Sequence, residues 1–489
     1  VQTEAGGEKN LVMPSASCVA NLNPLLEGYK EAAMLNPIYD PLYVIDVNET
    51  RYYLADSYEV SEDGMQITVK LKEGLKWHDG EAITADDMIF TMDVCSDTNN
   101  GAGGTNIVTL NDQPVKYEKV DDLTVKVTLP MASASYADLL GGLTLIPEHV
   151  FEGNPSVVSA GEANMKGIGS GSYKVTEFKQ DEYLLLEKYE DYYMGAPSID
   201  KVTFRIISDL SAQEVALMNG EVNFMELANA PAVAKYEADP NFTVVKYPEG
   251  RVNYLAVNKF CETVQDPKVV EAVFAALNRD EIIAGAYGDG MAESANSIFS
   301  NVNTFYDPSV EGYTQDVEKA KQLVKETGLD SKTLTLYFNS ERVYMKESAQ
   351  IIQQQLKNVG INLEVIPLES AGFFEKVFGT DGDYEFYLNG YGAVGDPDQV
   401  VAGMYDGTWG VNLAVSDEVS QLWKDARTVY TPEERAAIYK QIQIQTRDEL
   451  TCYPIAYPNY VFVTTSNIKG ADTIKRTPVF EDYTKLTME

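Results

Sequence analysis

One unit in the second half of the chain constrains the fold more than any other feature. TLTLYFNS (333–340) is typical of a strand, YMKESAQIIQQQLKNVG (344–360) of an amphipathic helix, and INLEVIPL (361–368) of a second strand. Strand, helix and strand in this order form a βαβ unit, which is the building block of α/β proteins. We therefore predict an α/β fold for this half of the chain.

Helix start and stop signals around this unit support the same fold class. Asp266 is placed as an N-cap directly before a proline. A further helix is predicted from Asp316 to a stop at Gly328, and Thr431 with Glu434 is predicted to form a capping box. Long amphipathic helices therefore alternate with short strands.

The first half of the chain shows strand spacing followed by one clear helix start. Ile67, Val69 and Leu71 alternate with polar residues, which is the pattern of a half-buried strand. Thr84 is predicted to be a helix N-cap, with Asp87 in the first turn, where the helix dipole favours a carboxylate. Neither half contains a repeat or a low-complexity linker, so we expect domain boundaries within ordinary loops.

Composition excludes several classes of partner. The 489 residues, 44% of them hydrophobic, are enough for two or more cores. The 75 Asp and Glu against 38 Lys and Arg give a net charge of −37, which repels polyanions, so nucleic acid and anionic membranes are not expected partners. No stretch reaches the roughly 18 apolar residues of a spanning helix. The polar start at Val1 suggests a processed N-terminus, with any membrane attachment upstream.

The histidines and cysteines define neither a metal site nor a redox site. His78 and His149 are 71 positions apart. The cysteines lack C-x-x-C spacing, which leaves one disulfide and buried free thiols as open alternatives. They are Cys18, Cys95, Cys261 and Cys452. No metal and no cofactor are predicted.

The stretch NGYGAVGDPDQ (389–399) contains a G-x-G-x-x-G pattern after a strand-like YEFYL, as dinucleotide-binding loops do. A dinucleotide loop presents a bare helix N-terminus to the pyrophosphate, whereas Asp396 and Asp398 occupy that position here and would repel the phosphates. We therefore interpret the glycines as residues of a tight turn.

Other motifs for catalysis are missing. DGDYEF (381–386) resembles the start of a calcium loop but has Phe386 where glycine is required. GIGSGSY (167–173) lacks the Lys-Ser/Thr of a phosphate loop, and neither H-E-x-x-H nor G-x-S-x-G occurs. A secreted glycoside hydrolase remains a third hypothesis, because it needs only two carboxylates; the first hypothesis is that the protein is not an enzyme.

Six segments lie in a characteristic order along almost the whole chain. They are NLNPLL (21–26), LADSYEVSEDGMQITVKLKEGLKWHDGEAITADDMIF (54–90), GIGSGSYKV (167–175), ALMNGEVNF (216–224), VNYLAVN (252–258) and VVEAVFAALNRDEII (269–283). In this order they resemble the family 5 extracellular solute-binding proteins of ABC importers, the group of oligopeptide-, dipeptide- and nickel-binding proteins. NLNPLL resembles an early strand segment of the family, and GIGSGSYKV resembles its G-x-G-P-Y turn, with Ser172 in place of proline.

The resemblance implies a bilobal α/β fold of the type II periplasmic-binding-protein kind, with an inserted third domain and a ligand cleft between the lobes. The boundaries that we expect are 1–52 and 167–253 for lobe I, 53–166 for the inserted domain, 254–462 for lobe II, and 463–489 for a return to lobe I.

The resemblance also implies a function. We expect an extracytoplasmic protein, periplasmic or held at the cell surface by an N-terminal lipid anchor absent from this chain. It would bind a peptide or peptide-like ligand as a monomer and deliver it to the permease subunits of an ABC transporter. An oligosaccharide or another polar solute on the same fold is the alternative hypothesis.

In peptide-binding relatives the glycine-rich segment commonly carries an aspartate that pairs with the ligand's ammonium group. Alignment on Asp396-Pro397 puts Ala393 at that position. Either another acid, such as Asp396 or Asp398, takes over, or the ligand lacks a free amine. Asp396 is also a candidate helix cap. Nickel is disfavoured, because neither histidine is close to this segment in the sequence.

The predicted ligand-binding residues come from several segments. For a peptide, the main chain of Gly390–Gly392 would pair with an extended ligand. For a sugar, Tyr391 and Trp409 would stack on the rings and the two aspartates would accept hydroxyl hydrogens. The full set is Asn23, Met34, Asn36, Tyr254, Asn258, Asn339, Arg342, Gly390, Tyr391, Gly392, Asp396, Asp398 and Trp409.

Overall fold

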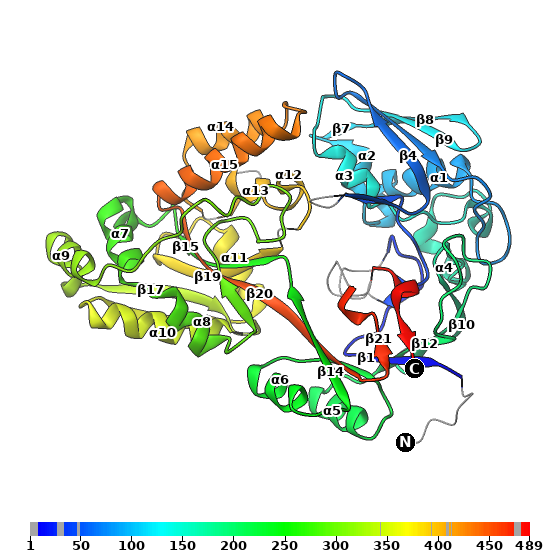
Figure 1. Cartoon of the computed structure of the whole chain (residues 1–489). Helices are drawn as coiled ribbons and strands as arrows, with labels where there is room; N and C mark the ends of the chain where they lie inside the picture. Colours follow the sequence, from blue (N-terminus) through cyan, green and yellow to red (C-terminus); the bar gives the residue numbers. More distant parts are fainter. Residues whose placement is uncertain are drawn as a thin grey trace. The chain divides into compact units, whose positions relative to one another are not determined.

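The chain folds as two units, which it enters and leaves more than once (Figure 1). The computed structural model describes residues 8–26, 34–45, 49–342, 344–392, 394–406, 410–411, 413–473 and 481–489. Residues 1–228, 232–246 and 461–489 form the first unit, and residues 229–231 and 247–460 form the second. The predicted boundaries of an inserted domain at 53–166 stay a prediction.

The first unit contains two separate four-stranded sheets. One has the order β1 (Asn10–Ser15), β12 (Lys201–Ile206), β11 (Tyr183–Lys188), β10 (Tyr173–Lys179), with β1 parallel to β12 and the other pairs antiparallel. The other is antiparallel, in the order β4 (Ala55–Val60), β5 (Gln66–Leu71), β9 (Thr124–Thr128), β8 (Lys116–Asp121). The predicted alternation of Ile67, Val69 and Leu71 is confirmed, since all three side chains are buried.

A hydrophobic core connects the β4–β5–β9–β8 sheet with its helices. Helix α1 (Ala85–Ser96) packs on β8 and β9, and its predicted cap at Thr84 is confirmed, with a complete capping box to Asp87. The core cluster contains buried residues from Leu25 to Val157 and includes the fully buried Trp77. These residues therefore share one core.

Short elements complete the first unit. They are β2 (Tyr43–Ile45), β3 (Thr50–Tyr52), α2 (Thr105–Val108), β6 (Thr109–Leu110), β7 (Gln113–Pro114), α3 (Tyr136–Gly141), α4 (Gly161–Asn164), α5 (Leu210–Met218), β13 (Phe224–Glu226), β21 (Ile468–Lys469) and β22 (Thr487–Met488). The early strand of this unit is Asn10–Ser15, whereas residues 21–26 form bends and a turn, so the strand expected at NLNPLL was wrong.

Three elements contain residues of both units. They are α6 (Ala230–Glu237), β14 (Phe242–Pro248) and β20 (Cys452–Thr465). Strand β20 pairs with β13 in its last residues, and with β15 (Arg251–Val257) and β16 (Ala292–Ser294) in its first residues.

The sheet of the second unit has the order β20, β15, β19 (Phe386–Gly392), β17 (Thr333–Asn339), β18 (Asn362–Leu368). Strand β17 is parallel to both β18 and β19, and β15 is antiparallel to β19. Helix α10 (Met345–Asn358) connects β17 to β18 and packs against both. The βαβ unit predicted from the sequence is confirmed.

Helices cover both faces of this sheet (Figure 1). Asn253 of β15 bonds the hydroxyl of Tyr287 at the end of α8 (Arg279–Ala286), whereas Tyr254 packs in a core cluster with Trp423 and Tyr439 from the other face. The remaining helices are α7 (Pro267–Ala276), α9 (Val317–Thr327), α11 (Ser370–Phe378), α12 (Pro397–Val400), α13 (Ala402–Tyr405), α14 (Asp417–Ala426) and α15 (Pro432–Asp448).

Most helix boundaries follow their local signals. Asp266 and Asp316 cap α7 and α9, and Gly328 ends α9 with φ 71°. The capping box predicted at Thr431 is wrong, because the Thr431 hydroxyl donates to the Glu434 carboxylate at 2.5 Å and caps no backbone N–H.

Candidate functional site

The ends of four strands meet at one edge of the second unit's sheet. Because β17, β18 and β19 are parallel, their carboxyl ends at Asn339, Leu368 and Gly392 lie on the same side. Strand β15 runs the opposite way, so it begins there, at Arg251. In α/β sheets, ligands bind outside the carboxyl ends of the parallel strands.

The glycines of this edge are strand residues. Gly390 and Gly392 lie in β19 opposite Asn253 and Arg251, so their interpretation as a tight turn was wrong. Only Gly395, with φ 85°, has the left-handed backbone that a turn requires. The strand pattern before Gly390 does not show where the strand ends. Here β19 continues to Gly392, because β15 pairs with residues beyond Gly390.

The main chain of Asn389–Gly392 is paired on one side and extends past its neighbour on the other. Its β15 partners run as far as Arg251. The register with β17 ends at Phe338 opposite Leu388. The last residues of β19 therefore continue beyond Phe338, the last residue of β17 that pairs with β19.

Charged side chains surround this strand end. Arg251 donates from Nη2 to the carbonyl oxygen of Gly390 at 2.8 Å. Burial raises the pKa of Glu249, and the neighbouring Arg251 and Arg342 oppose that rise. We call Glu249, Arg251, Asn339, Arg342 and Gly390–Gly392 the strand-end cluster.

The strand-end cluster contains two guanidinium groups and the carboxylate of Glu249, and the neighbouring Glu341 adds a second carboxylate beside Arg342. Burial is the main cause that lowers the pKa of Arg251, and Glu249 acts against it. Arg342 is exposed. The exposed guanidinium of Arg342 can bind an anionic group of a ligand at this edge.

The tyrosines of the predicted site belong to the core. Tyr254 and Tyr391 are buried, with ring centroids 5.1 Å apart. The Tyr391 hydroxyl donates to the Ile298 carbonyl at 2.6 Å and lies 3.1 Å from the Tyr405 hydroxyl. The expectation that Tyr391 offers a stacking face to a sugar is therefore wrong.

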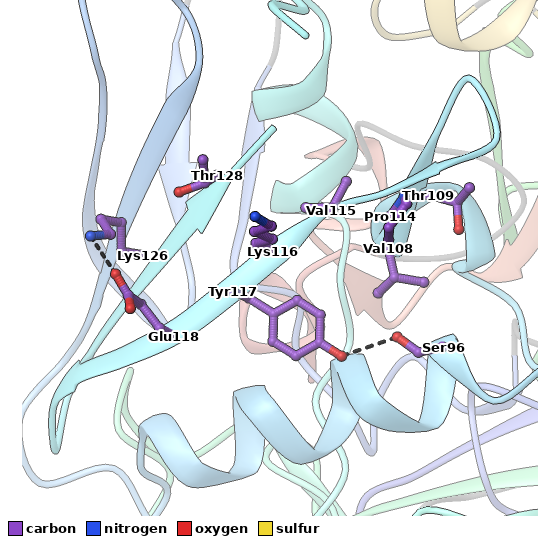
Figure 2. A pocket seen from close by; sticks show the side chains of 10 residues that line it. All are labelled: Ser96, Val108, Thr109, Pro114, Val115, Lys116, Tyr117, Glu118, Lys126 and Thr128. Carbon is purple, nitrogen blue, oxygen red and sulfur yellow. Dashed lines mark hydrogen bonds and ion pairs between the residues drawn. The ribbon is translucent and has the colours of Figure 1, made fainter. Parts of the chain in front are cut away.

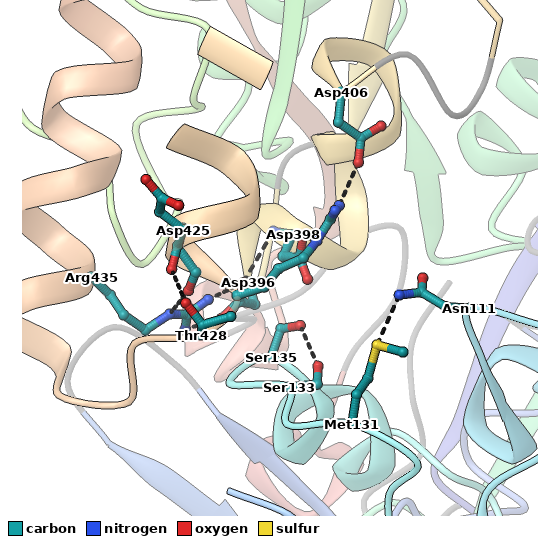
Figure 3. Close-up of polar contacts among 12 residues, drawn as sticks. Asn111, Met131, Ser133, Ser135, Asp396, Asp398, Asp406, Asp425, Thr428 and Arg435 are labelled. Atoms are coloured by element: carbon teal, nitrogen blue, oxygen red, sulfur yellow. Dashed lines mark hydrogen bonds and ion pairs between the residues drawn. The ribbon is translucent and has the colours of Figure 1, made fainter. Parts of the chain in front are cut away.

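The two aspartates after the glycines are held by arginines (Figure 3). Asp396 caps α12 and also forms a buried ion pair with Arg435. Asp398 forms an ion pair with Arg427. Of the two roles predicted for Asp396, helix capping is confirmed, and its carboxylate serves the protein's own arginine.

The remaining predicted residues are spread over the molecule. Asn339 belongs to the strand-end cluster and donates to the Ser370 hydroxyl at 2.9 Å. Asn258 lies beyond the opposite end of β15, where its amide bonds the carbonyl oxygens of Asp381 and Tyr384.

In the first unit, the side-chain amide of Asn23 bonds Asn164 at 2.9 Å, Met34 is buried, and Asn36 is exposed in a turn. Ala393 and Trp409 lie outside the described residues. The strand-end cluster therefore contains only Asn339, Arg342 and the Gly390–Gly392 segment from the predicted set.

Sequence reasoning missed Glu249, Arg251, Arg427 and Arg435. The signal for the first two was the pair of charges around Gly250, directly before the apolar strand VNYLAV. The signal for Arg435 was a cation in the first turns of a helix, where the helix dipole disfavours positive charge. Such a cation needs a compensating anion nearby.

A cavity of about 660 Å³ lies in the first unit beside β8 and β9 (Figure 2). Its polar wall is largely self-satisfied, since Lys126 pairs with Glu118 and the Tyr117 and Ser96 hydroxyls are 3.0 Å apart. It is not lined by the carboxyl ends of parallel strands, because β8 and β9 are antiparallel. We therefore do not place the functional site there.

Two searches were confined to the described residues. None of the helices there combines the length and the apolar character that a membrane crossing needs. No group of three or more His, Cys, Asp or Glu in that part of the chain is arranged to hold a metal ion.

The fold and the sheet edge define a class of protein. Mixed α/β units with a site at the carboxyl ends of parallel strands are typical of type II periplasmic binding proteins. Residues 49–412 match the bacterial extracellular solute-binding proteins, family 5. The chain belongs to this family, as the motifs in its sequence predicted, and is therefore the solute-binding component of an ABC import system.

Relatives along the whole length support this assignment. The dipeptide-binding protein of Escherichia coli K12 is 26% identical over 499 aligned positions, which cover 94% of this chain and 92% of that protein. The crystal structure of the ABC transporter substrate-binding protein CtaP of Listeria monocytogenes has a TM-score of 0.91 and 32% identity, covering 98% of this chain and 99% of that chain. The structure of a putative peptide-binding protein AppA of Clostridium difficile has a TM-score of 0.90 and 34% identity, covering 99% and 100%. The predicted bilobal α/β fold class is confirmed.

Proposed function

We propose that this protein captures peptides outside the cytoplasm and delivers them to the permease of an ABC importer. Support comes from the family and from two similar proteins, whose names describe dipeptide binding and peptide binding. The strand-end cluster is our candidate for the ligand contact in the second unit.

The observation that carries the proposal is the extension of β19 past β17. A peptide in extended conformation can add to such a strand through main-chain hydrogen bonds, which do not depend on the peptide's side chains. Asn389–Gly392 provides this main chain, with its other side already paired to β15. Binding of many peptide sequences by one site follows from this mode.

The charges of the strand-end cluster suggest how the ends of the peptide are bound. Arg342 is exposed and can form two parallel hydrogen bonds with a carboxylate, so we assign the peptide's terminal carboxylate to it. Glu249 is the carboxylate directly before β15. It adjoins Gly250, where an added Cβ would collide with the side chain of Val394. We therefore assign the ammonium group to Glu249.

A sugar ligand has less support. The side chains that we expected to serve a sugar are engaged elsewhere, since Tyr391 is buried and Asp396 and Asp398 pair with arginines. No aromatic face remains among the described residues of the predicted sugar site.

The partner and the location of the protein are also proposed from its family. We propose that exposed residues of the protein contact the permease and that the protein acts as a monomer. We also propose that it lies in the periplasm or is held at the cell surface by an N-terminal lipid. The family is extracellular.

A binding experiment separates peptides from sugars. The purified protein is mixed with a tryptic digest of casein, or with cello- and xylo-oligosaccharides, and bound molecules are identified by mass spectrometry after gel filtration. Thermal unfolding is measured in parallel, because a ligand that binds only the native state stabilises it by RT ln(1 + [L]/Kd). Peptides should be retained and raise the melting temperature. Retention of sugars alone would refute the proposal.

A second experiment tests Arg342. Retained peptides are synthesised with a free or an amidated C-terminus and titrated into the wild type and Arg342→Gln. Loss of a charge-assisted hydrogen bond should cost the wild type about tenfold in affinity on amidation, and the variant much less. Arg205→Gln is the control, because Arg205 pairs with Glu221 on the first unit's surface. Equal losses in the wild type and Arg342→Gln would contradict the role of Arg342.

A further inference from the structure

The segment after the strand-end cluster is held by side chains rather than by strand pairing. It contains α12 and α13, each of four residues. Helices shorter than about 12 residues are marginal without outside contacts. Here Val401, Ala402, Met404 and Tyr405 pack in the hydrophobic core, and Asp396, Asp398 and Asp406 add ion pairs with two arginines. We call these three aspartates, with Arg427 and Arg435, the acid clasp.

Arg435 holds the start of the segment. Its Nη1 and Nη2 donate to the two carboxylate oxygens of Asp396, at 2.5 and 3.0 Å (Figure 3). Its Nη2 also donates to the Tyr439 hydroxyl at 2.8 Å. The guanidinium lies 4.9 Å from the ring centre of Phe305 and 5.2 Å from that of Tyr439. Hydrogen bonds in the guanidinium plane and rings near its carbon fix the group in one orientation.

Arg427 holds the two short helices together. Its Nε donates to Asp398 at 2.5 Å and its Nη2 to Asp406 at 2.6 Å. Asp398 lies in α12, and Asp406 caps the end of α13. One guanidinium therefore ties together the two ends of the α12–α13 segment.

The carboxylates of the acid clasp depend on these arginines. The side chains of Asp396, Asp398 and Asp406 are 8%, 7% and 1% exposed. A carboxylate buried to this extent is unfavourable without counter-charges, so removal of an arginine takes away a counter-charge and weakens the hold on the segment.

A rearrangement at Asp396 would reach the strand-end cluster. Asp396 is four positions from Gly392, and the intervening Gly395 carbonyl accepts a hydrogen bond from Asn303 at 2.9 Å. The other end of the connection, Gly392, is paired with Arg251. The described contacts of this short connection lie at its two ends, at Gly395 and at Val394, whose side chain faces Gly250.

We propose that Arg435 and Arg427 are positioning residues for ligand binding. They hold the α12–α13 segment so that the last residues of β19 stay extended, and they set the affinity for ligand through that main chain. The effect of the arginines on affinity rests on the proposed function. Their effect on the conformation of β19 can be measured in the unliganded protein and does not depend on that function.

The first test measures hydrogen exchange of the unliganded protein. In Arg435→Met, amides of 389–396 should exchange at least tenfold faster than in the wild type, whereas amides of β17 should keep their protection. Arg447→Met is the matched control, because Arg447 is on the same helix but pairs with the exposed Asp448. A uniform loss of protection across the unit, or no change at 389–396, would overturn the proposal.

The second test measures the half-saturating concentration of the casein peptide pool by equilibrium dialysis, well below each variant's melting temperature. Arg435→Met should raise it tenfold or more, Arg435→Lys should restore part of the affinity, and Arg447→Met should leave it unchanged. Arg427→Met, whose side chain is 29% exposed, tests the same role if Arg435→Met does not fold. Wild-type affinity in folded Arg435→Met and Arg427→Met would refute the positioning role. A wild type that retains no peptide would instead refute the proposed function. Hydrogen exchange would still test whether the acid clasp keeps the last residues of β19 extended.

Discussion

Two glycine-rich stretches look alike in the sequence but differ in what requires their glycines. GIGSG (167–171) lies in the first unit and GYGAVG (390–395) in the second. The first is packed against another segment's main chain, whereas the first half of the second is a strand. A glycine pattern therefore has a meaning only together with the atoms that face it.

In the first stretch the neighbouring atoms are backbone. A Cβ added at Gly169 would lie 2.0 Å from the carbonyl oxygen of Ile38. Gly171 donates its N–H to the same carbonyl at 2.7 Å. His78 holds the stretch from another side, since Gly169 N–H donates to Nδ1 at 3.2 Å and Nε2 donates to the Gly171 carbonyl at 2.9 Å.

In the second stretch the neighbour is a side chain. A Cβ added at Gly390 would lie 2.0 Å from Oδ1 of Asn253, and one added at Gly392 would meet no atom within 4 Å. A side chain can turn aside at a limited cost, whereas a paired main chain cannot. The two stretches should therefore respond differently to the same substitution.

The largest expected effect is at Gly169. Gly169→Ala should lower the free energy of unfolding by about 3 kcal/mol or more, because the added methyl collides with main chain that is itself hydrogen-bonded. Denaturant unfolding measures this change. Gly161→Ala is the control, since a Cβ at Gly161 meets no atom within 4 Å. A loss below about 1 kcal/mol would show that the Ile38 segment can move.

The next effect is a loss of stability in acid through His78. Burial lowers the pKa of His78 to about 4. The unfolded imidazole, with a pKa near 6.5, binds its proton first, so stability should fall by roughly 3 kcal/mol as the pH falls from 6.5 to 4. Unfolding at several pH values should show a smaller acid loss in His78→Gln.

Asp40 should act in the opposite direction. Its N–H donates to the Ser170 hydroxyl, and burial raises the pKa of its carboxyl to about 7, against the hydrogen bonds from Tyr192 and Tyr193. The folded state then holds a proton that the unfolded state loses near pH 4, so stability should fall by about 2 kcal/mol between pH 5 and 8. Asp40→Asn should lack this fall. Asp191→Asn, at an exposed acid, should retain it.

The smallest effect is expected in the second stretch. Gly390→Ala should cost about 1 to 2 kcal/mol, because Asn253 must turn away and its 2.7 Å hydrogen bond to Tyr287 must change. Gly392→Ala is the matched control in the same strand and should change stability by less than about 0.5 kcal/mol. Equal losses at Gly390 and Gly392 would contradict the contrast between them.

Elements with local causes could be predicted from the sequence. Thr84, Asp266 and Asp316 cap their helices because the donors they satisfy are two or three residues away. The βαβ unit was predicted because the spacing of hydrophobic residues changes from that of a strand to that of a helix and back. The ordered motifs along the chain then identified the family.

The candidate site could be predicted only in part. Arg342 and Gly390–Gly392 were found because they follow strand patterns. Arg251 was missed, although it opens β15 at the same sheet edge, because which strands are neighbours is not a property of any one segment. Asp396 was identified with two open roles, and Arg435, 39 residues later, decides that its carboxylate is occupied.

By itself the sequence determined the α/β class, the helix caps, the family and the glycine-rich segment, since each depends on residue patterns within one segment or on the order of segments. Only the tertiary structure decided that Gly390 and Gly392 are strand residues, that Tyr391 faces the core, and that the acidic helix start is neutralised by arginines. The physical reason is that strand pairing, burial and ion pairing depend on atoms brought together from distant parts of the chain.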